Sequence, residues 1–183
     1  MTSGRIDRRT ERTRAALRLA FVEMVLTAGY EATAVGDIIR RANVGRSTFY
    51  LHYSSKEALL VESLERPCRG LVACAGGDAT PQMLIPQLDH FRDQHRLNRV
   101  FFEHPIRRLW VRRLAVLIER KVALGSRAGR GRTRMPRSLL ALTIAEMQIG
   151  LIVHWLTGAV AVKSEVIAEA LVFNTRAMLA AAR

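Results

Sequence analysis

The sequence holds few of the residues that cross-link a chain or perform catalysis. Only two of its 183 residues are cysteines, Cys68 and Cys74, which excludes a disulfide framework and gives no metal-ligand spacing. No Gly-x-Ser-x-Gly motif or phosphate-binding glycine loop occurs, and no two of the five histidines lie four residues apart. Asp89, His90 and Asp93 could hold a metal on one helix, although a solvated polar face is the favoured interpretation. We expect no catalytic residue, metal site or cofactor, and therefore no enzyme.

Long apolar runs are also absent from the sequence. No run reaches the roughly 18 apolar residues that a bilayer-spanning helix needs. The N-terminus is polar and basic, without the apolar segment of a secretory signal. A hydrophobic content of 49% and a charged content of 25% are typical of a soluble globular protein. These features predict a cytoplasmic protein without a membrane partner.

Acidic residues are scarce relative to basic ones. The chain has 29 lysines and arginines against 16 aspartates and glutamates, and its net charge of +13 suits a nucleic-acid partner. Most of this excess lies late in the chain, since residues 1–66 hold 11 basic and 8 acidic side chains and residues 67–183 hold 18 and 8. Residues 107–137 alone hold 11 basic side chains and a single acid, Glu119. For this cluster a solvated face and a flexible loop are favoured over an additional nucleic-acid contact.

The first 30 residues predict an arm followed by a helix. Residues 1–9 are expected to be disordered, either as an unstructured tail or as a basic arm that holds a nucleic-acid backbone. A helix is expected from Thr10 to Ala28, because apolar residues recur on one face. Gly29 is well placed to end it. The predicted buried stripe consists of Leu17, Ala20, Phe21, Met24, Val25 and Ala28.

Residues 33–57 carry the strongest local pattern, and they predict two short helices, a tight turn between them and the start of a third helix. Thr33 is placed to cap the first of these helices, and Asp37 lies near its positive end. Asn43 follows the helix and tolerates the left-handed conformation that the turn requires. Val44 is expected to fill the gap between the two helices. The apolar face of the first helix consists of Val35, Ile38, Ile39 and Ala42.

The second short helix, expected over residues 46–52, carries hydrogen-bond donors on its outer face. Phe49 and Tyr53 lie four residues apart and should face the interior. The outer residues include no acid, a combination that suits the major groove of DNA. They are Arg46, Ser47, Thr48, Tyr50 and His52. The third helix is expected to start at Ser54, because Ser54 and Glu57 have the spacing of a capping box.

This stretch, with the helix before it, resembles the DNA-binding domain of TetR/AcrR-type transcriptional regulators. The resemblance rests on an Ala-x-Val-x-Arg-x-Thr-Phe-Tyr run at residues 42–50, followed by Ser-Lys-Glu-Ala-Leu at residues 55–59. Asn43 stands where the family often has glycine, a change that the turn tolerates. Gly45 stands where a serine often caps the recognition helix, which weakens the cap and leaves one phosphate contact in doubt. A helical hairpin without a role in DNA binding is the alternative.

The resemblance implies an all-α fold of about nine helices in a regulator that binds double-stranded operator DNA. A three-helix DNA-binding domain with a helix-turn-helix would occupy residues 1–54, and a helical ligand-binding and dimerisation domain residues 55–183. Lys56, at the positive end of the third helix, would hold a phosphate. The full set of expected DNA contacts is Thr33, Gly45, Arg46, Ser47, Thr48, Tyr50, His52 and Lys56.

The rest of the chain predicts further helices around loops. Pro67 should kink or break the third helix near Arg66. Residues 125–134 lack any apolar residue larger than alanine and should form a flexible loop. A short apolar stretch occupies residues 97–103. The later helices are expected over residues 81–96, 104–124, 136–156 and 164–181.

The last two helices are too apolar to be covered by their own domain. The helix at 136–157 is apolar nearly all round and must be buried on every face, and the helix at 164–181 has a stripe too wide for one neighbour. A two-fold copy of the chain would cover both as a four-helix bundle. The resemblance implies the same homodimer, and Gly150 would allow close approach at its seam.

The resemblance also implies a pocket for an unknown small-molecule effector. Its walls would come from Phe91, Phe101, Trp110, Met147 and Leu151. Glu146 and His154 are candidate polar ligands, although a position facing the dimer seam or solvent is the favoured interpretation. The expected function is a repressor that binds a palindromic operator as a homodimer and is released by the effector. The alternative is a constitutive DNA-binding protein or a helical interaction protein without an effector.

Overall fold

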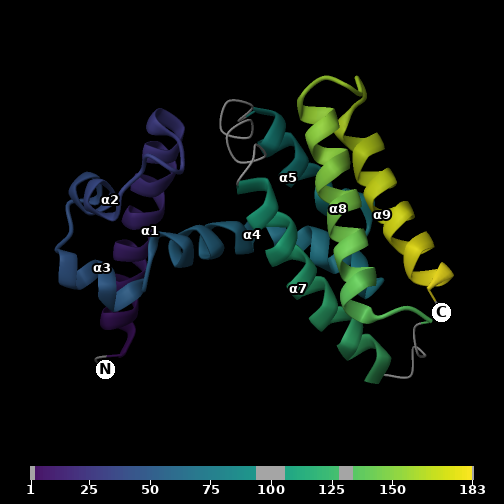
Figure 1. Cartoon of the computed structure of the whole chain (residues 1–183), viewed down its shortest axis with the longest axis horizontal. Coiled ribbons are helices and arrows are strands. Elements are labelled where there is room, and N and C mark those ends of the chain that lie inside the picture. Colours follow the sequence, from purple (N-terminus) through teal and green to yellow (C-terminus); the bar gives the residue numbers. More distant parts are fainter. Residues whose placement is uncertain (1–2, 94–105, 128–133, 183) are drawn as a thin grey trace. The chain divides into compact units, whose positions relative to one another are not determined.

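The chain is seen in a computed structural model that describes residues 3–93, 106–127 and 134–182 (Figure 1). Every regular element in these residues is an α-helix, which confirms the all-α expectation. They form eight helices, α1 to α5 and α7 to α9. The apolar stretch at 97–103 and much of the loop expected at 125–134 lie outside the described residues. The chain divides into two compact units, Met1–Ser63 and Leu64–Arg183.

The N-terminal unit consists of α1 (Ser3–Ala28), α2 (Val35–Ala42), α3 (Arg46–His52) and the first part of α4 (Lys56–Gly76). Removal of their apolar side chains from water is the main force that holds these short helices together. The unit reaches beyond the boundary expected after residue 54, because two leucines in the first turns of α4 are fully buried. The core is formed by Leu17, Ala20, Phe21, Val25, Ile38, Phe49, Tyr53, Leu59 and Leu60.

The start of α1 differs from the sequence-based expectation. The helix begins at Ser3, so a disordered arm over residues 3–9 is wrong. These residues contain no proline and three arginines, which are good helix formers, and an existing helix propagates at little cost. At the other end Gly29 has a φ of +83°, and its N–H donates to the Val25 carbonyl at 2.9 Å. Gly29 therefore ends the helix as predicted.

The sequence predicted a kink or a break of α4 at Pro67, and the break is wrong. The helix continues to Gly76. A proline inside a helix removes one backbone hydrogen bond. Here the buried side chains of Leu64, Cys68 and Leu71 lie on both sides of the proline and keep the two halves of the helix packed.

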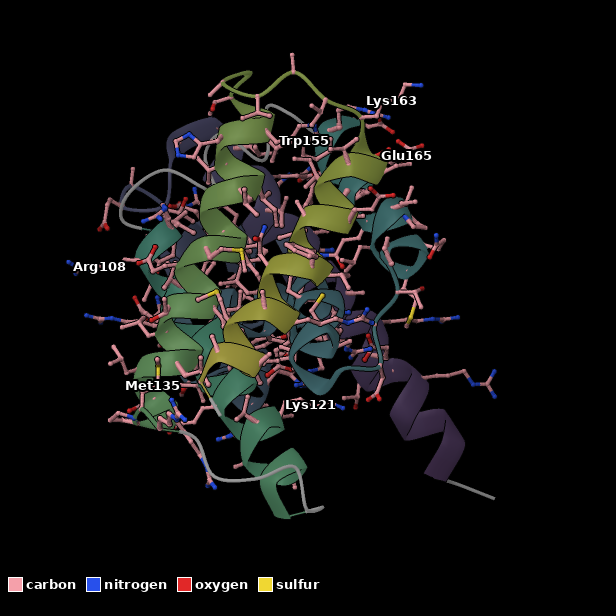
Figure 2. All side chains as sticks on the ribbon, turned by 90° about the vertical axis from the view of Figure 1, so that its right-hand side faces the viewer. Arg108, Lys121, Met135, Trp155, Lys163 and Glu165 are labelled. Carbon is pink, nitrogen blue, oxygen red and sulfur yellow. The ribbon has the colours of Figure 1, made fainter. Side chains whose placement is uncertain are left out.

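The C-terminal unit contains the rest of α4, α5 (Pro81–Asp93), α7 (Ile106–Arg127), α8 (Arg137–Leu156) and α9 (Ser164–Ala181). α8 packs against α7 on one side and α9 on the other, and α5 packs against α9. Figure 2 looks onto the face that α8 and α9 form side by side.

The helix α8 is long and apolar enough to cross a membrane by length and composition alone. In this structure it is a core helix. Its fully buried Gln148 donates to the Leu71 carbonyl at 3.1 Å and to the Thr175 hydroxyl at 3.0 Å, which ties α8 to α4 and α9. Leu139 and Leu142 remain exposed, so the expectation of burial on every face is not met within one chain.

Candidate nucleic-acid interface

The start of α2 is built differently from the predicted cap. The residue before the helix is Ala34, and its N–H donates to the Asp37 carboxylate at 3.3 Å. Thr33 is only 1% exposed, and its hydroxyl donates to the Gly29 carbonyl at 2.7 Å. The capping role predicted for Thr33 is therefore wrong. A buried hydroxyl that is already bonded has no surface to offer DNA, so we leave Thr33 out of the contact set.

The turn between α2 and α3 has the predicted left-handed residue. Asn43 has φ 53° and ψ 49°, and its N–H donates to the Arg40 carbonyl at 3.2 Å. The Val44 N–H donates to the Ile39 carbonyl at 3.2 Å. These two bonds are those of a Schellman motif, which satisfies the last carbonyls of α2 and fixes the direction in which the chain leaves the helix. The turn therefore sets the angle at which α3 begins.

The recognition helix α3 separates a buried side from an exposed side as predicted. Phe49 is fully buried, and its ring centroid lies 5.9 Å from that of the buried Tyr53. Gly45, with φ −74° and ψ 153°, precedes the helix without any side-chain cap. Leu51 is 80% exposed, and the sequence analysis did not select it. On the outer side Arg46, Ser47 and Tyr50 are exposed, and Thr48 and His52 are half-buried.

The first turn of α4 is anchored within the N-terminal unit. Its cap is Ser55 rather than Ser54, since the Ser55 hydroxyl accepts from the Ala58 N–H at 3.2 Å. Hydrogen bonds from its own backbone N–H and from Ser55 lower the pKa of Glu57, and the Tyr30 hydroxyl donates to this carboxylate at 3.2 Å.

Lys56 is engaged inside the protein, although the sequence predicted a free phosphate contact. Its ammonium donates to the Tyr30 carbonyl at 2.8 Å and lies 4.2 Å from the centroid of the Tyr30 ring. An ammonium group has three N–H donors. The remaining donors are free to reach a phosphate, while the contact with Tyr30 holds the start of α4.

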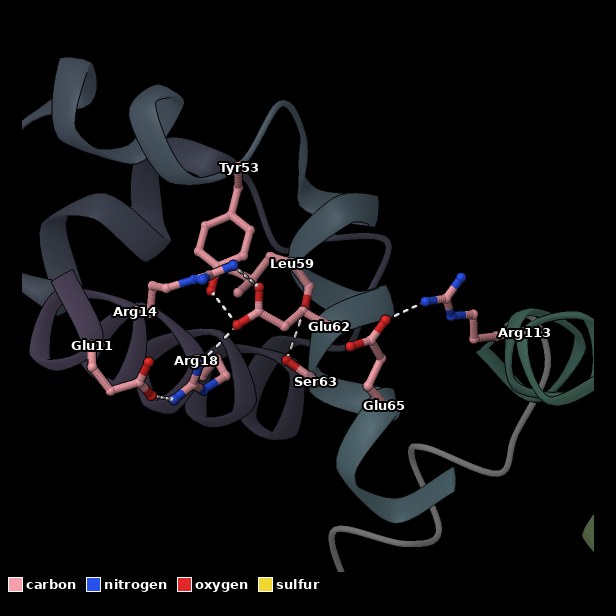
Figure 3. A network of polar contacts seen from close by, with 9 residues as sticks. All are labelled: Glu11, Arg14, Arg18, Tyr53, Leu59, Glu62, Ser63, Glu65 and Arg113. Carbon is pink, nitrogen blue, oxygen red and sulfur yellow. Dashed lines mark hydrogen bonds and ion pairs between the residues drawn. The ribbon is translucent and has the colours of Figure 1, made fainter. Parts of the chain in front are cut away.

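A cluster of charged side chains joins α1 to α4, and sequence reasoning missed it (Figure 3). The Glu62 carboxylate accepts from Arg14 and Arg18, each at 2.8 Å, and from the Tyr53 hydroxyl at 3.0 Å. Arg18 also donates to Glu11 at 2.7 Å. We call these five residues the Glu62 cluster. The only sequence signal was the i, i+4 spacing of the two arginines on α1.

The residues expected to line an effector pocket are only partly brought together. The Phe91 and Trp110 rings are buried and meet edge to face, with centroids 6.4 Å apart. Glu146 is exposed and forms an ion pair with Arg107 at 2.7 Å. Met147 and Leu151 are half-buried and His154 is exposed. Phe101 lies outside the described residues.

Metal-ligating side chains do not gather in the described part of the chain. No group of three or more histidine, cysteine or acidic residues lies close enough there to hold an ion. Asp89 instead pairs with Arg92 at 2.9 Å and accepts from the Ser164 hydroxyl at 2.7 Å.

Comparisons with known proteins agree with the helix-turn-helix described above. Residues 15–62 match the family model for "Bacterial regulatory proteins, tetR family". Over 68 residues the chain is 41% identical to the uncharacterized HTH-type transcriptional regulator YxbF of Bacillus subtilis (strain 168), a match that covers 37% of this chain and 18% of that protein. The chain thus spans less than a fifth of the length of this relative.

Solved structures extend the similarity to the whole fold. A TetR transcriptional regulator from Streptococcus agalactiae 2603V is 26% identical, covers 94% of this chain and 98% of its own, and superimposes with a TM-score of 0.61. A TetR-family regulator from Streptomyces coelicolor A3 is 18% identical, with coverages of 93% and 96% and a TM-score of 0.67.

Together the all-α fold and the helix-turn-helix are similar to those of helical DNA-binding regulators. More particularly, residues 15–62 match the TetR family of bacterial regulatory proteins, and the fold of the whole chain is similar to that of a solved TetR regulator.

Proposed function

We propose that this protein is a sequence-specific DNA-binding repressor. The observation that carries the proposal is the outer side of α3, where Arg46, Ser47 and Tyr50 are exposed on a helix anchored from behind by Phe49. Side chains at the start of a recognition helix reach base edges in the major groove. A repressor acts by occupying its operator, so a reporter gene behind that operator should be expressed more strongly when the protein is removed.

Different residues of this surface are assigned different contacts. Arg46, Ser47 and Thr48, near the start of α3, are assigned to base edges, where each lost contact costs about 1–3 kcal/mol of discrimination. Tyr50, Lys56 and the Gly45 backbone N–H are assigned to phosphates, which position the helix. His52, half-buried at the end of α3, is assigned a supporting backbone contact.

The proposed operator is palindromic, because we propose a homodimer through α8 and α9. Large apolar side chains remain exposed on these two helices, including Phe173 at 70%, and exposed apolar surface of this kind marks a protein interface. The others are Leu139, Leu142 and Val166. A symmetric dimer requires two half-sites whose recognition helices are about 34–36 Å apart.

The proposal includes release by a small molecule bound in the C-terminal unit beside Phe91 and Trp110. A ligand that favours the conformation unable to bind DNA lowers operator affinity, and about 1–3 kcal/mol of coupling gives a 5–150-fold release. By reciprocity, operator DNA must weaken ligand binding by the same factor. The proposed location is the cytoplasm, where operator DNA is found.

The test begins with selection of duplexes from a randomised library by the full-length chain. A palindromic motif is expected, and a gel shift with the selected duplex should be lost when an active effector is added from a compound library. A sequence-independent shift would refute the repressor. A specific shift that no compound releases would support the constitutive DNA-binding alternative.

Two variants test the contacts that are assigned to phosphates. Tyr50→Phe and Lys56→Ala should weaken binding to all duplexes about equally, and Lys56→Ala should lower the salt slope by roughly one unit per half-site. A changed base preference in either variant would contradict the phosphate assignment. Because Lys56 also holds Tyr30, its variant must first be shown to be folded by circular dichroism.

The dimer is tested by light scattering without DNA at micromolar concentration. The wild-type chain should have twice the mass of one chain, and Phe173→Glu should have the monomer mass. Val116→Glu is the matched control, since Val116 is also an exposed apolar residue but lies on α7. A monomeric wild type would refute the proposed dimer.

A further inference from the structure

The carboxylate of Glu62 accepts hydrogen bonds from three side chains of the N-terminal unit. One oxygen accepts from Arg18 and from the Tyr53 hydroxyl, and the other accepts from Arg14 (Figure 3). The Glu62 side chain is 23% exposed, and those of Arg14 and Arg18 are 38% and 31% exposed. Charge-assisted bonds of this length are about twice as strong as neutral ones, and partial burial reduces their screening by salt.

The three donors come from α1 and from the end of α3, two elements whose relative orientation must be fixed for DNA recognition. Arg14 and Arg18 lie on α1, whereas Tyr53 is the residue that ends α3. The Tyr53 N–H donates to the Phe49 carbonyl at 2.8 Å, and its ring is buried against Phe49. Burial raises the pKa of the Tyr53 phenol, which therefore stays protonated and donates to Glu62. Glu62 thus binds both α1 and Tyr53, the residue that ends the recognition helix.

The recognition helix depends on such tertiary contacts for its orientation. α3 has only seven residues, and Gly45 offers no side-chain cap at its start. A helix this short is not stable alone in water. Its direction is set at the start by the Asn43 turn, along its length by Phe49 and at its end by Tyr53. Glu62 is the group that fixes the polar end of Tyr53.

The cluster also occupies two arginines of a unit that we propose to bind DNA. A guanidinium that is paired with a carboxylate is not available to neutralise a phosphate. Removal of the Glu62 charge would leave Arg14 with no carboxylate among the described residues, and Arg18 with Glu11 only. Each additional phosphate contact steepens the salt dependence of binding by about 0.9 unit.

We propose that Glu62 is a positioning residue for operator recognition, which fixes the end of α3 and withholds Arg14 and Arg18 from DNA phosphates. This inference rests on the proposed function. It predicts effects of opposite sign: loss of the carboxylate weakens binding to the operator relative to other DNA, and strengthens binding to DNA of any sequence.

The experiment compares the full-length wild type with Glu62→Gln and Glu11→Gln. Both variants remove one negative charge from the same unit, but Glu11 is 64% exposed and forms its ion pair with Arg18. Fluorescence anisotropy is measured over a salt series with two probes: the duplex selected by the wild type, and a shuffled duplex of the same length and composition. Circular dichroism establishes that each variant is folded at the temperature used.

For Glu62→Gln the ratio of operator to shuffled affinity should fall about tenfold, the size of one lost base contact. Its affinity for the shuffled duplex should rise, with a salt slope steeper by about one to two units. Glu11→Gln should keep the ratio within about twofold of the wild type. A purely structural role would instead lower both affinities together, in proportion to the folded fraction.

An unchanged ratio in folded Glu62→Gln, or an equal fall in Glu11→Gln, would overturn the inference. If Glu62→Gln does not fold, Tyr53→Phe decides, because it removes one donor and leaves both arginines paired. That variant should lower the ratio by about two- to tenfold, as expected for one hydrogen bond, without any gain for the shuffled duplex. An unchanged ratio in Tyr53→Phe would refute the positioning role. A wild type without preference for any duplex would refute the proposed function instead.

Discussion

The N-terminal unit holds several ion-paired arginines, whereas α7 combines paired arginines with an exposed row that has no such partner among the described residues. In the N-terminal unit Arg14 and Arg18 meet Glu62, Arg40 pairs with Asp37, and Arg41 pairs with Glu23 at 2.7 Å. On α7 three exposed arginines form no ion pair with any carboxylate in the described residues. They are Arg108, Arg112 and Arg120, at spacings of four and eight along one side of the helix (Arg108 is labelled in Figure 2).

The excess of positive charge therefore lies mostly outside the unit that carries the proposed DNA-reading surface. The region with the helix-turn-helix has a net charge of +3, from 11 basic and 8 acidic residues, whereas residues 67–183 carry +10, from 18 and 8. Net charge governs the general attraction to polyanions. Specific recognition needs donors at fixed positions, and the carboxylates of the N-terminal unit help to fix them.

The largest effect is expected from the buried side of α3. Phe49→Ala removes a fully buried ring from the core of the N-terminal unit and should destabilise that unit by about 3–5 kcal/mol. Leu51→Ala, on the same helix but 80% exposed, should change stability by no more than about 0.5 kcal/mol. Urea unfolding followed by circular dichroism measures both. Equal losses would show that the buried and exposed sides of α3 have been assigned wrongly.

The next largest effect is expected from Arg46 on α3, in contrast to the exposed arginines of α7. Arg46→Ala should change the preferred base at one position of each half-site, at about 1–3 kcal/mol. Simultaneous replacement of Arg108, Arg112 and Arg120 by glutamine should leave the selected motif unchanged, although it removes three charges instead of one. Selection from a randomised duplex library tests both variants. A changed motif for the α7 variant would show that α7 takes part in reading, and would favour an additional DNA contact over a solvated face.

Local features of the fold were predictable from the sequence because short-range sterics decide them. Asn43 follows an apolar face and precedes Val44, so a left-handed residue and a turn were expected, and both are found. The i, i+4 pair Phe49 and Tyr53 faces inward as predicted. Gly29 ends α1 for the same kind of reason. The helix-turn-helix was predicted from these local rules, and the all-α class was implied by the resemblance to TetR/AcrR-type regulators.

Long-range polar contacts could not be predicted in this way. Arg14 and Arg18 meet Glu62 across 48 and 44 residues of sequence, and no periodicity indicates such a partner. Thr33 was misassigned because its hydroxyl donates to the Gly29 carbonyl instead of accepting from an N–H at the start of α2. The break predicted at Pro67 failed because burial on both sides of a proline outweighs one missing hydrogen bond.

A smaller effect is expected from substitutions at two left-handed helix ends, one in each unit. Asn43 ends α2 with φ 53°, and Gly158 follows α8 with φ +79°. Left-handed backbone costs a residue with a Cβ about 1–2 kcal/mol, less for asparagine. Asn43→Gly should therefore stabilise the N-terminal unit by up to about 1 kcal/mol, and Gly158→Asn should destabilise the C-terminal unit by a similar amount. Thermal unfolding measures both changes. A loss of stability in Asn43→Gly would mean that the asparagine side chain itself holds the turn.

The smallest effect concerns the two helix starts on either side of the recognition helix. α4 is capped by the Ser55 hydroxyl, which accepts from the Ala58 N–H at 3.2 Å, whereas Gly45 before α3 provides no such acceptor. A Cβ at residue 45 would have only ordinary contacts, at 3.6 Å from the Thr48 hydroxyl and 3.8 Å from that of Ser47, and the backbone φ of −74° suits any residue. Gly45→Ser should thus stabilise α3 by a few tenths of a kcal/mol, about the difference between these two residues at an N-cap.

The reverse change, Ser55→Gly, should cost about the same few tenths at α4. Urea unfolding of the two single variants and of the double variant tests whether the gain and the loss cancel, as they should for caps on separate helices. A serine at residue 45 has a further consequence, because its hydroxyl would sit beside the proposed phosphate contact of the backbone N–H. If that assignment is correct, Gly45→Ser should change affinity for all duplexes alike and leave the base preference intact. A stabilised variant with an altered preference would instead place residue 45 against a base and move the reading surface toward the turn.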